Sequence, residues 1–259
     1  MVVEANHSAS LMNRHVLGMR VDATDYDDAT RRVVAWARER ESRYVCVANV
    51  HMAMEAYDSD KFRRIVNEAD LVTPDGMPLV WMLRKLGKPD QERVYGPELM
   101  LRVCEAAARE GLPVGFYGGA QETLDKLVAS VKMKYPTLEV AYSCSPPFRQ
   151  LSPDEDSRIV EEINVSGARI LFVGLGCPKQ EMWMASHRGR VQSVMLGVGA
   201  AFDFHAGRVP QAPAWMQRAG LEWLFRLITE PRRLWRRYAK HNPRFVLLAT
   251  MQLLGLRKF

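Results

Sequence analysis

The sequence predicts an α/β protein with a Rossmann-like architecture, in which a mostly parallel β-sheet is flanked by helices. From residue 44 onward, short β-branched or aromatic segments alternate with longer segments of helical periodicity, as in a doubly wound sheet. Several of the short segments are apolar throughout, which is typical of strands covered on both faces. Beyond residue 207 we find no strand pattern, so we expect the chain to end in a helical, membrane-associating appendage.

Each element of the α/β region follows from its own segment. The segments that match strands, in chain order, are 44–48, 69–73, 114–117, 139–143, 170–173 and 193–196. The segments of helical periodicity between them are 97–110, 122–135, 153–166 and 179–188. The helix at 153–166 has the clearest start, because Ser152 can cap it, Pro153 fits its first turn, and three acidic residues follow where the helix dipole favours them.

Residues 208–259 differ in character from residues 1–207, and we predict a domain boundary between the two. Prolines interrupt segments rich in Arg, Trp and Leu at positions 210, 213 and 231. Basic residues then recur on one stripe of a predicted helix, at positions 233, 236, 237, 240 and 244. We expect Asn242 and Pro243 to end this helix and to begin another, whose sequence FVLLATMQLLGL is apolar on every side.

The net charge is distributed unevenly between these two regions. The chain has 36 Lys and Arg against 30 Asp and Glu, a formal charge of +6. Residues 208–259 hold 11 of the basic and only 2 of the acidic residues, so the region before them is slightly acidic. With 47% hydrophobic and 25% charged residues the composition is that of a globular protein, which excludes disorder, collagen-like repeats and a disulfide scaffold.

We expect no segment that spans a membrane or directs secretion. The longest uncharged runs, 191–202 and 245–256, have 12 residues, whereas a membrane-spanning helix needs about 20. Residues 1–15 lack the apolar core and the cleavage site of a secretory signal. The four cysteines form no C-x-x-C pair, so we interpret them as buried thiols of a cytoplasmic protein rather than as zinc ligands or disulfides.

The loops that follow the predicted strands are the first places to search for a ligand site, because open α/β sheets bind ligands at the carboxyl ends of their strands. Five of these loops carry glycine or polar residues, among them Asn49, His51, Asp75, Gly118, Gly119, Gly176, Pro178, Lys179, Gln180, Gly199 and Asp203. Glycine-rich turns before helices can bind phosphate through backbone N–H groups. Taken singly, each such turn is also explained by ordinary turn chemistry.

Asp75 is the candidate catalytic carboxylate. It lies between Pro74 and Gly76 at a strand end, where it could accept a proton from an attacking hydroxyl. The alternative is that it caps the helix expected over residues 76–87. The segment 178–181 also has two interpretations, since it could hold sugar hydroxyls or phosphate, or simply begin a helix.

No metal site is predicted. The D-x-D sequences at 25–27 and 58–60 formally match the motif of metal-dependent sugar transferases, but both lie in turns that open helices, and we interpret them as capping acids. The histidines form no H-x-x-x-H or triad-like pattern. We expect His51 to line the ligand cleft, and His187 and His205 to be structural.

The basic appendage is predicted to bind an anionic membrane surface. Its cations alternate with aromatic residues and precede an apolar helix that is too short to span a bilayer. In such an interfacial element, basic side chains meet anionic headgroups, aromatic rings lie at the boundary and leucines enter the acyl region. Nucleic-acid binding and a solvated or oligomer-forming face are the alternatives; we predict no nucleic-acid partner, and a homo-oligomer remains open.

Several long segments of the sequence resemble the WecG/TagA/CpsF family of bacterial glycosyltransferases. These segments are ADLVTPDGMPLVW, ERVYGPEL, PPFR, FVGLGCPKQEMW and the stretch from GVGAAFDFHAGRVP to EPRRLWRR. The resemblance covers about residues 16–245. It implies transfer of a sugar of N-acetylmannosamine or glucose type from a UDP-sugar to a polyprenyl-diphosphate-linked saccharide, in surface or exopolysaccharide biosynthesis at the inner face of the cell membrane. It also implies inversion, no metal, no cofactor and an appendage that completes the active site.

The resemblance further implies roles for individual residues. Asp75 would be the general base, while Arg93 and Gln180 would help to bind the donor diphosphate and to orient the sugar. The residues expected to line the nucleotide-sugar site are Asn49, Gly118, Gly119, Gly176, Pro178, Lys179, Gly199 and Asp203, the last of which would contact the nucleotide base. The appendage cations expected to reach a diphosphate are Arg226, Arg233 and Arg236.

Two departures from the family pattern leave the sugar and acceptor preference open. Val47 stands where many relatives have Thr, and Gly96-Pro97-Glu98 stands where many have Gly-Ser-Asp.

Functions of other classes compete with glycosyl transfer. One is a non-catalytic nucleotide- or sugar-binding regulatory module with a basic docking tail. The other is a nicotinamide-dependent oxidoreductase, which is disfavoured because no G-x-G-x-x-G opens the first βα unit.

Overall fold

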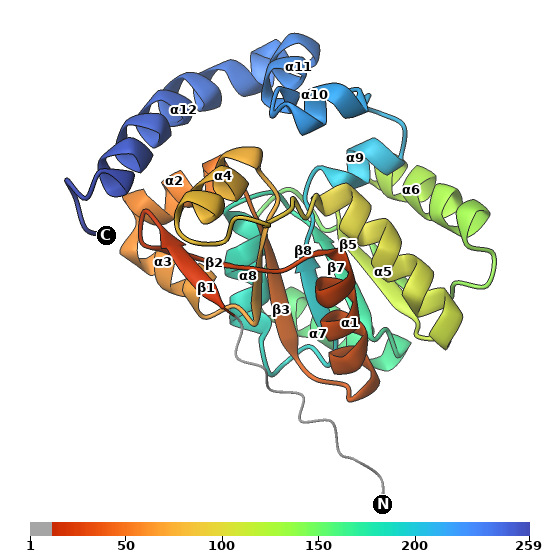
Figure 1. Ribbon diagram of the computed structural model, residues 1–259. Helices are drawn as coiled ribbons and strands as arrows, with labels where there is room; N and C mark the ends of the chain where they lie inside the picture. The colour runs from red at the N-terminus through yellow and green to blue at the C-terminus, as the bar shows by residue number, and fades with distance from the viewer. Residues whose placement is uncertain (1–11) are drawn as a thin grey trace, which may run out of the picture.

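The computed structural model describes residues 12–259 and has the predicted fold class, a six-stranded parallel sheet between two layers of helices (Figure 1). The question of a secretory signal therefore falls mostly outside the described residues. The sheet order is β4-β3-β8-β7-β5-β6. The strands are β3 (Arg43–Ala48), β4 (Leu71–Pro74), β5 (Val114–Gly118), β6 (Val140–Cys144), β7 (Ile170–Gly174) and β8 (Val194–Gly197). All six predicted strands are confirmed, with boundaries that differ by at most two residues.

A short antiparallel hairpin precedes the sheet and lies outside the predicted elements. It pairs β1 (Asn13–Val16) with β2 (Met19–Asp22) through a turn at Leu17 and Gly18, both with positive φ. Strands of four residues are too short for a convincing alternation of apolar and polar residues. The buried Asp22 carboxylate accepts a hydrogen bond from the Val72 backbone N–H at 2.7 Å, which joins the hairpin to β4.

Helices cover both faces of the sheet and enclose two apolar cores. The helices over one face are α1 (Tyr26–Arg38), α5 (Gly96–Glu110), α6 (Gln121–Lys134) and α9 (Ala201–His205). The helices that pack into the other core are α2 (Val50–Asp58), α3 (Asp60–Asn67), α4 (Met77–Lys85), α7 (Pro153–Ser166) and α8 (Lys179–His187). All predicted helices of this region are confirmed, which supports reading them from apolar periodicity.

Helix starts explain most of the polar residues at the element boundaries. Ser152 caps α7 in a capping box with Glu155, and Asp25 caps α1 by accepting a hydrogen bond from the Asp28 N–H at 2.8 Å. The interpretation of Asp58 as a capping acid is wrong. Asp58 ends α2 and pairs with Arg244 through two hydrogen bonds, while Ser59 takes the capping position of α3.

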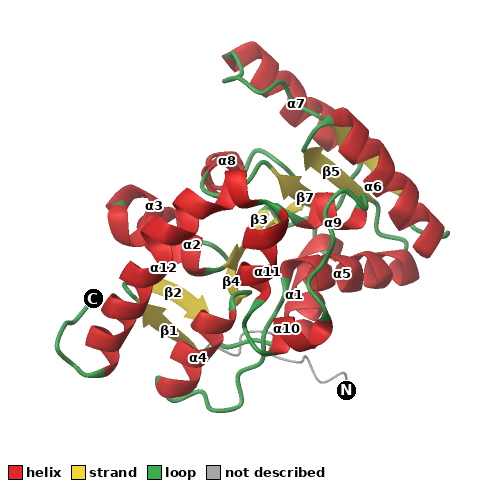
Figure 2. Ribbon diagram, turned by 90° about the horizontal axis from the view of Figure 1, so that it is seen from above, coloured by secondary structure: helices red, strands yellow, loops and turns green. Residues whose placement is uncertain are grey.

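The appendage forms an arch over the carboxyl edge of the sheet (Figures 1 and 2). Its helices are α10 (Ala214–Arg218), α11 (Glu222–Thr229) and α12 (Pro231–Leu253). The predicted break at Pro243 is wrong, because α12 runs through it. A proline removes one backbone hydrogen bond, and burial of Phe245, Leu248 and Ala249 in the core beside α2 compensates for that loss.

One face of the C-terminal half of α12 is therefore buried, and the other is exposed. Val246 and Leu247 are more than 60% exposed, although they stand next to the buried Phe245 and Leu248. None of the helices in residues 12–259 combines the length and the apolar character needed to cross a bilayer.

Candidate active site

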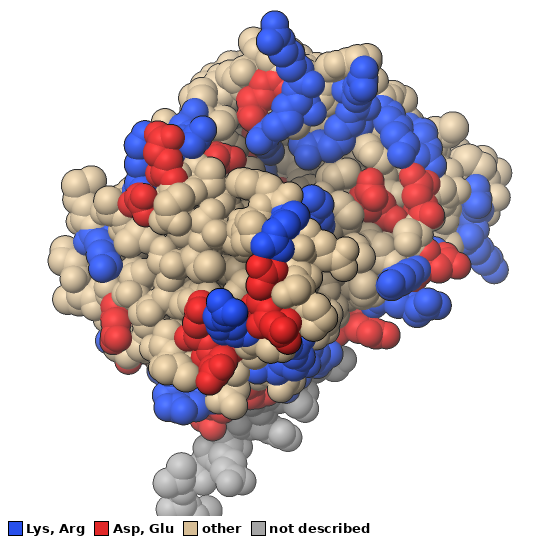
Figure 3. Space-filling view, turned by 180° about the vertical axis from the view of Figure 1, so that it is seen from behind, with Lys and Arg blue, Asp and Glu red and all other residues tan. Residues whose placement is uncertain are grey.

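A cleft of about 1210 Å³ lies between the carboxyl edge of the sheet and the appendage. The α/β region before residue 208, called the body from here on, lines the cleft with the loops that follow β3, β4, β7 and β8. The appendage lines it with residues of α11 and α12. Figure 3 shows Lys and Arg side chains gathered at the top of the molecule, around a hollow on this face. The appendage therefore supplies one wall of the cleft.

The body wall of the cleft is formed by helix beginnings. The chain leaves β3, β4 and β7 at this edge and starts α2, α4 and α8, so that the N-termini of three helices point to the cleft. Asn49 caps α2 by accepting a hydrogen bond from the Met52 N–H, and it lines the cleft as predicted. Helix N-termini carry partial positive charge and free N–H groups, which favours an anionic ligand here.

Asp75 lies on the floor of the cleft, at the end of β4. Its backbone N–H donates to the Ala48 carbonyl at 2.8 Å, which ties the loop to the neighbouring strand. Its side chain, 16% exposed, makes no helix cap; one carboxylate oxygen accepts from the Gly96 N–H at 3.2 Å and from Arg93 at 3.4 Å. Burial raises the pKa of Asp75 to about 6, although Arg93 lowers it. A carboxylate of this kind is deprotonated at neutral pH yet basic enough to accept a proton.

Arg93 joins the body to the appendage. It donates to the Asp75 carbonyl oxygen through Nε, to the Asp75 carboxylate, and at 2.6 Å to the carboxylate of Glu222 in α11. Its guanidinium also lies 4.1 Å from the centroid of the Tyr95 ring. Because Arg93 and Glu222 are each only 14% exposed, this ion pair is largely shielded from water.

Gln180 is buried in the first turn of α8 and organises the glycine turn rather than projecting freely. Its Oε1 accepts from the Gly176 N–H at 3.2 Å, and its Nε2 donates to Glu181 at 2.7 Å. The same side chain lies against Gly197 and Gly199 of the next loop. Gln180 therefore holds together two loops that line the cleft.

Three arginines of the appendage line the cleft, and the second acidic residue of the appendage holds two of them. Glu230 pairs with Arg233 at 2.8 Å and with Arg226 at 3.5 Å. Arg226 also faces the ring of Phe204, and its Nε is buried without a hydrogen-bond partner among the described residues. Arg233 comes within 3.9 Å of Asp203, which is near the cleft as predicted. With Arg237 alongside, the cations outnumber the carboxylates on this wall.

Five of the residues singled out from the sequence do not line the cleft: Gly118, Gly119, Pro178, Lys179 and Arg236. Gly118 ends β5, Gly119 follows it, and β5 lies beyond β7 in the sheet. A Cβ on Gly118 would come within 2.7 Å of the Gly174 backbone. That close approach explains the glycine by packing. Lys179 and Arg236 are exposed, and the Arg236 guanidinium lies over the ring of Trp235.

The histidines behave as expected from the sequence. His51 lines the cleft. His187 is buried against the Trp183 ring and contacts Asp156 at 2.9 Å. His205 contacts the Pro97 carbonyl oxygen.

One position that departs from the family pattern adjoins the candidate base. A Cβ built on Gly96 would lie 3.1 Å from a methyl group of Val47, so the Val47 side chain packs directly on Gly96. Gly96 in turn donates its N–H to Asp75. Val47 thus borders the hydrogen-bond environment of the Asp75 carboxylate.

Glu222 and Glu230 are the functional candidates that sequence reasoning missed. Both are negative residues in a segment that is otherwise basic, and this contrast was the available signal. Each orients arginines that line the cleft, which no local pattern could indicate because Glu222 and Arg93 are 129 positions apart. Together, a basic carboxylate on the floor and cations above it suit attack by a hydroxyl with departure of a phosphate-linked group.

Comparison with known proteins identifies the family. The model of the glycosyl transferase WecG/TagA/CpsF family matches residues 14–259. The chain is also similar to the N-acetylglucosaminyldiphosphoundecaprenol N-acetyl-beta-D-mannosaminyltransferase of Bacillus spizizenii, with 30% identity over 200 residues. That alignment covers 77% of this chain and 76% of the relative.

Proposed function

The chain belongs to the WecG/TagA/CpsF family of glycosyl transferases, and from this premise we propose that it moves an N-acetylmannosamine-type sugar from UDP to a polyprenyl-diphosphate-linked saccharide. The name of the Bacillus relative supports the proposed sugar and the proposed kind of acceptor. That protein is named for transfer of an N-acetylmannosaminyl group to N-acetylglucosaminyldiphosphoundecaprenol. Such a product is an intermediate of a cell-envelope polysaccharide.

The single observation that carries the proposal is that a carboxylate on the floor of the cleft faces arginines on the opposite wall. Asp75 and Arg93 lie on the floor, and Arg226, Arg233 and Arg237 line the opposite wall. An acceptor hydroxyl needs a base, and a departing nucleoside diphosphate needs cations. Arginines suit the second task because their planar donors match phosphate oxygens in pairs.

In the proposed reaction, Asp75 accepts the proton of the acceptor hydroxyl as its oxygen attacks the anomeric carbon. Attack comes from the face opposite UDP, so the anomeric centre is inverted. The C–O bond to the diphosphate breaks as the new C–O bond forms, and UDP leaves with the bonding electrons. The pKa of Asp75, raised to about 6 by burial, keeps the group ionised at neutral pH while leaving it basic.

The negative charge that develops on the departing diphosphate is proposed to be stabilised by the chain's own cations rather than by a metal. Arg226 and Arg233 are held in position by Glu230, and the N-termini of α2, α4 and α8 add partial positive charge. Arg93 is held by Glu222 beside Asp75, where it can orient the sugar or the near phosphate.

The outer surface of the appendage is proposed to lie on an anionic membrane, where the lipid-linked acceptor is found. Leu247, Leu254 and Leu256 are each more than 60% exposed and do not line the cleft, and Trp235, which does line it, is still 52% exposed. Arg236 and Lys240, both exposed, stand on the same helix. Apolar and aromatic side chains next to cations are typical of helices that bind the membrane interface.

The decisive test is transfer itself. The purified protein is incubated with a set of UDP-sugars and with a short-chain polyprenyl-diphosphate N-acetylglucosamine, and UDP release and the lipid product are measured. We expect acceptor-dependent release of UDP from UDP-N-acetylmannosamine above that from the other donors. UDP binding without transfer to any acceptor would instead support a non-catalytic nucleotide-binding module.

A further inference from the structure

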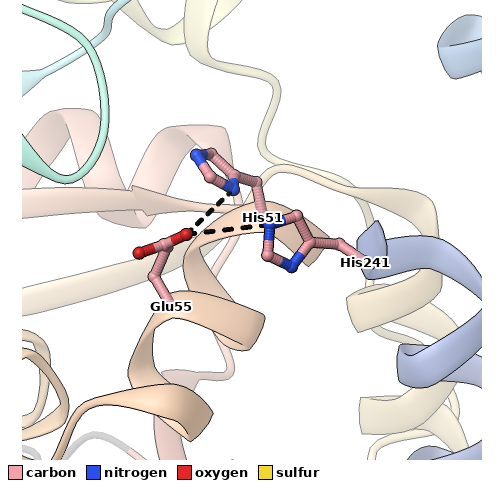
Figure 4. A group of neighbouring side chains, drawn as sticks. All are labelled: His51, Glu55 and His241. Atoms are coloured by element: carbon pink, nitrogen blue, oxygen red, sulfur yellow. Dashed lines mark ion pairs between the residues drawn. The ribbon is translucent and has the colours of Figure 1, made fainter. Parts of the chain in front are cut away.

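His51, Glu55 and His241 form a cluster at the seam between α2 and α12, on the wall of the cleft. Figure 4 shows the three side chains directed toward one another, two from α2 and one from α12. Oε1 of Glu55 lies 3.8 Å from Nδ1 of His51 and 3.7 Å from Nε2 of His241. One ligand atom from each residue lies within 4.8 Å of the others. Two imidazoles and one carboxylate are a ligand set found in zinc sites.

One ring nitrogen of each histidine in this cluster has no hydrogen-bond partner among the described residues. Nδ1 of His51 and Nδ1 of His241 are both buried, and neither has a hydrogen-bond partner among the described residues. Buried polar atoms are nearly always partnered, so each exception calls for an explanation such as a bound ion or water. For His51 the unpartnered nitrogen is the one that faces Glu55, whereas for His241 it is the other ring nitrogen, because Nε2 faces Glu55.

The two separations that involve Glu55 require little movement, and the two histidines lie within 4.8 Å of each other. In a tetrahedral zinc site with bonds of about 2.0–2.1 Å, ligand atoms lie about 3.3 Å apart. The observed 3.7 and 3.8 Å separations exceed this by only about half an ångström. His51 and Glu55 are four residues apart on α2, so they project from one face of the helix.

The surrounding charges narrow the choice of metal. Arg237, Lys240 and Arg244 lie near the cluster and oppose a cation, although Arg244 is neutralised by its two hydrogen bonds to Asp58. A hard cation such as Mg²⁺, which prefers several oxygen ligands, would gain little from two imidazoles. Zn²⁺ and related transition metals bind imidazole well enough to offset this repulsion.

We propose that His51, Glu55 and His241 bind one Zn²⁺-class divalent cation that fastens α12 of the appendage to α2 of the body. The fourth position of a tetrahedral site is left for water or for a ligand in the cleft. Bound metal would fix the wall that carries the appendage arginines. This role is independent of the transfer reaction, and it is separate from a metal on the donor diphosphate.

Metal binding is tested on the full-length protein after removal of metals with a chelator. Titration with Zn²⁺ by calorimetry should show one saturable site, and Co²⁺ should produce the visible absorption bands of a four-coordinate complex. Binding should weaken at least about tenfold in His51→Gln, Glu55→Gln and His241→Gln, since losing a direct ligand costs no less than losing its supporting partner. Mg²⁺ should not compete.

A matched control and a second readout keep the test independent of misfolding. His15→Gln removes an exposed histidine of the β1–β2 hairpin and should leave the affinity unchanged. Zn²⁺ should also slow hydrogen exchange in α2 and α12 of the wild type, and not in His241→Gln. The proposal is overturned if Zn²⁺ binds the wild type and all three cluster variants with equal affinity, or if Zn²⁺ leaves exchange in α12 unchanged.

Discussion

The α/β body and the C-terminal appendage contribute opposite chemistry to one cleft. The body places a carboxylate with a raised pKa at the end of a buried strand, and the appendage places arginines across from it. The body positions Asp75 through hydrogen bonds with the backbone of Ala48 and Gly96, whereas in the appendage Glu230 positions Arg226 and Arg233 and Glu222 positions Arg93 of the body. The comparison teaches that the acidic residues of a basic segment are informative, because they show which cations are held in place.

The largest effect is expected from the body, at Asp75. Asp75→Asn removes the proposed base and leaves the shape of the cleft, so kcat should fall about 10²–10⁴-fold while UDP binding is retained. Steady-state transfer and calorimetric UDP binding measure the two quantities. Asp154→Asn, on the exposed start of α7, is the matched control. An Asp75→Asn enzyme with normal kcat would remove Asp75 from the mechanism.

The next effect separates the inner from the outer arginines of the appendage. Arg226→Gln and Arg233→Gln should each lower kcat/KM about a hundredfold, because each removes a cation from the cleft wall. Arg236→Gln should keep transfer to a short-chain acceptor and weaken liposome binding about fivefold, since one basic residue contributes about 1 kcal/mol at an anionic surface. Equal loss of transfer in all three variants would contradict the assignment of Arg236 to the outer surface.

The two faces of α12 offer a third contrast, in stability and membrane binding. Leu248→Ala should lower the free energy of unfolding by about 2–3 kcal/mol, because Leu248 belongs to the core beside α2. Leu247→Ser, one position away and 62% exposed, should leave thermal unfolding nearly unchanged and reduce binding to anionic vesicles. Unchanged vesicle binding in Leu247→Ser would show that this face does not contact lipid.

A smaller effect is expected from the influence of the appendage on the pKa of Asp75 in the body. The negative charge of Glu222 raises the pKa of Asp75. The substitution Glu222→Gln should therefore lower the pKa of Asp75, and Asp75 should stay ionised at lower pH. The acid limb of the kcat/KM profile, near pH 6 in the wild type, should then move to lower pH. Glu230→Gln, which lies next to Arg226 and Arg233, is the control and should leave the limb in place. A limb that stays at the wild-type pH in Glu222→Gln would refute the coupling.

The smallest effect is expected at Glu181, a body carboxylate with no proposed catalytic role. Burial raises its pKa to about 7, from 4.5. A raised carboxyl pKa contributes stability that is present below about pH 4.5 and lost as the pH rises through about 7. Glu181→Gln should therefore be more stable than the wild type at pH 8, by on the order of 1 kcal/mol, and not at pH 4. Thermal unfolding of the variant and the wild type at the two pH values measures this difference in stability. An equal difference at pH 4 and pH 8 would contradict a destabilising buried charge at Glu181.

The fold class, the six strands, the helices between them and the charge contrast between body and appendage could all be predicted from the sequence. These features depend on local periodicity and composition, which are written in consecutive residues. The family motifs also singled out Asp75, Arg93 and the appendage arginines, whose catalytic roles stay predictions. Gly118 shows the limit of such reasoning, since the same glycine turn that suggests a phosphate site is required here by the close approach of β5 and β7.

Contacts between residues far apart in the chain could be identified only in the folded structure. The pairing of Arg93 with Glu222 and the cluster of His51, Glu55 and His241 join positions far apart in the chain. The continuation of α12 through Pro243 likewise depends on packing against α2, which outweighs a local helix-breaking tendency. The physical reason is common to all three: contacts between distant elements depend on how both pack, and no periodicity within one segment encodes the partner in the other.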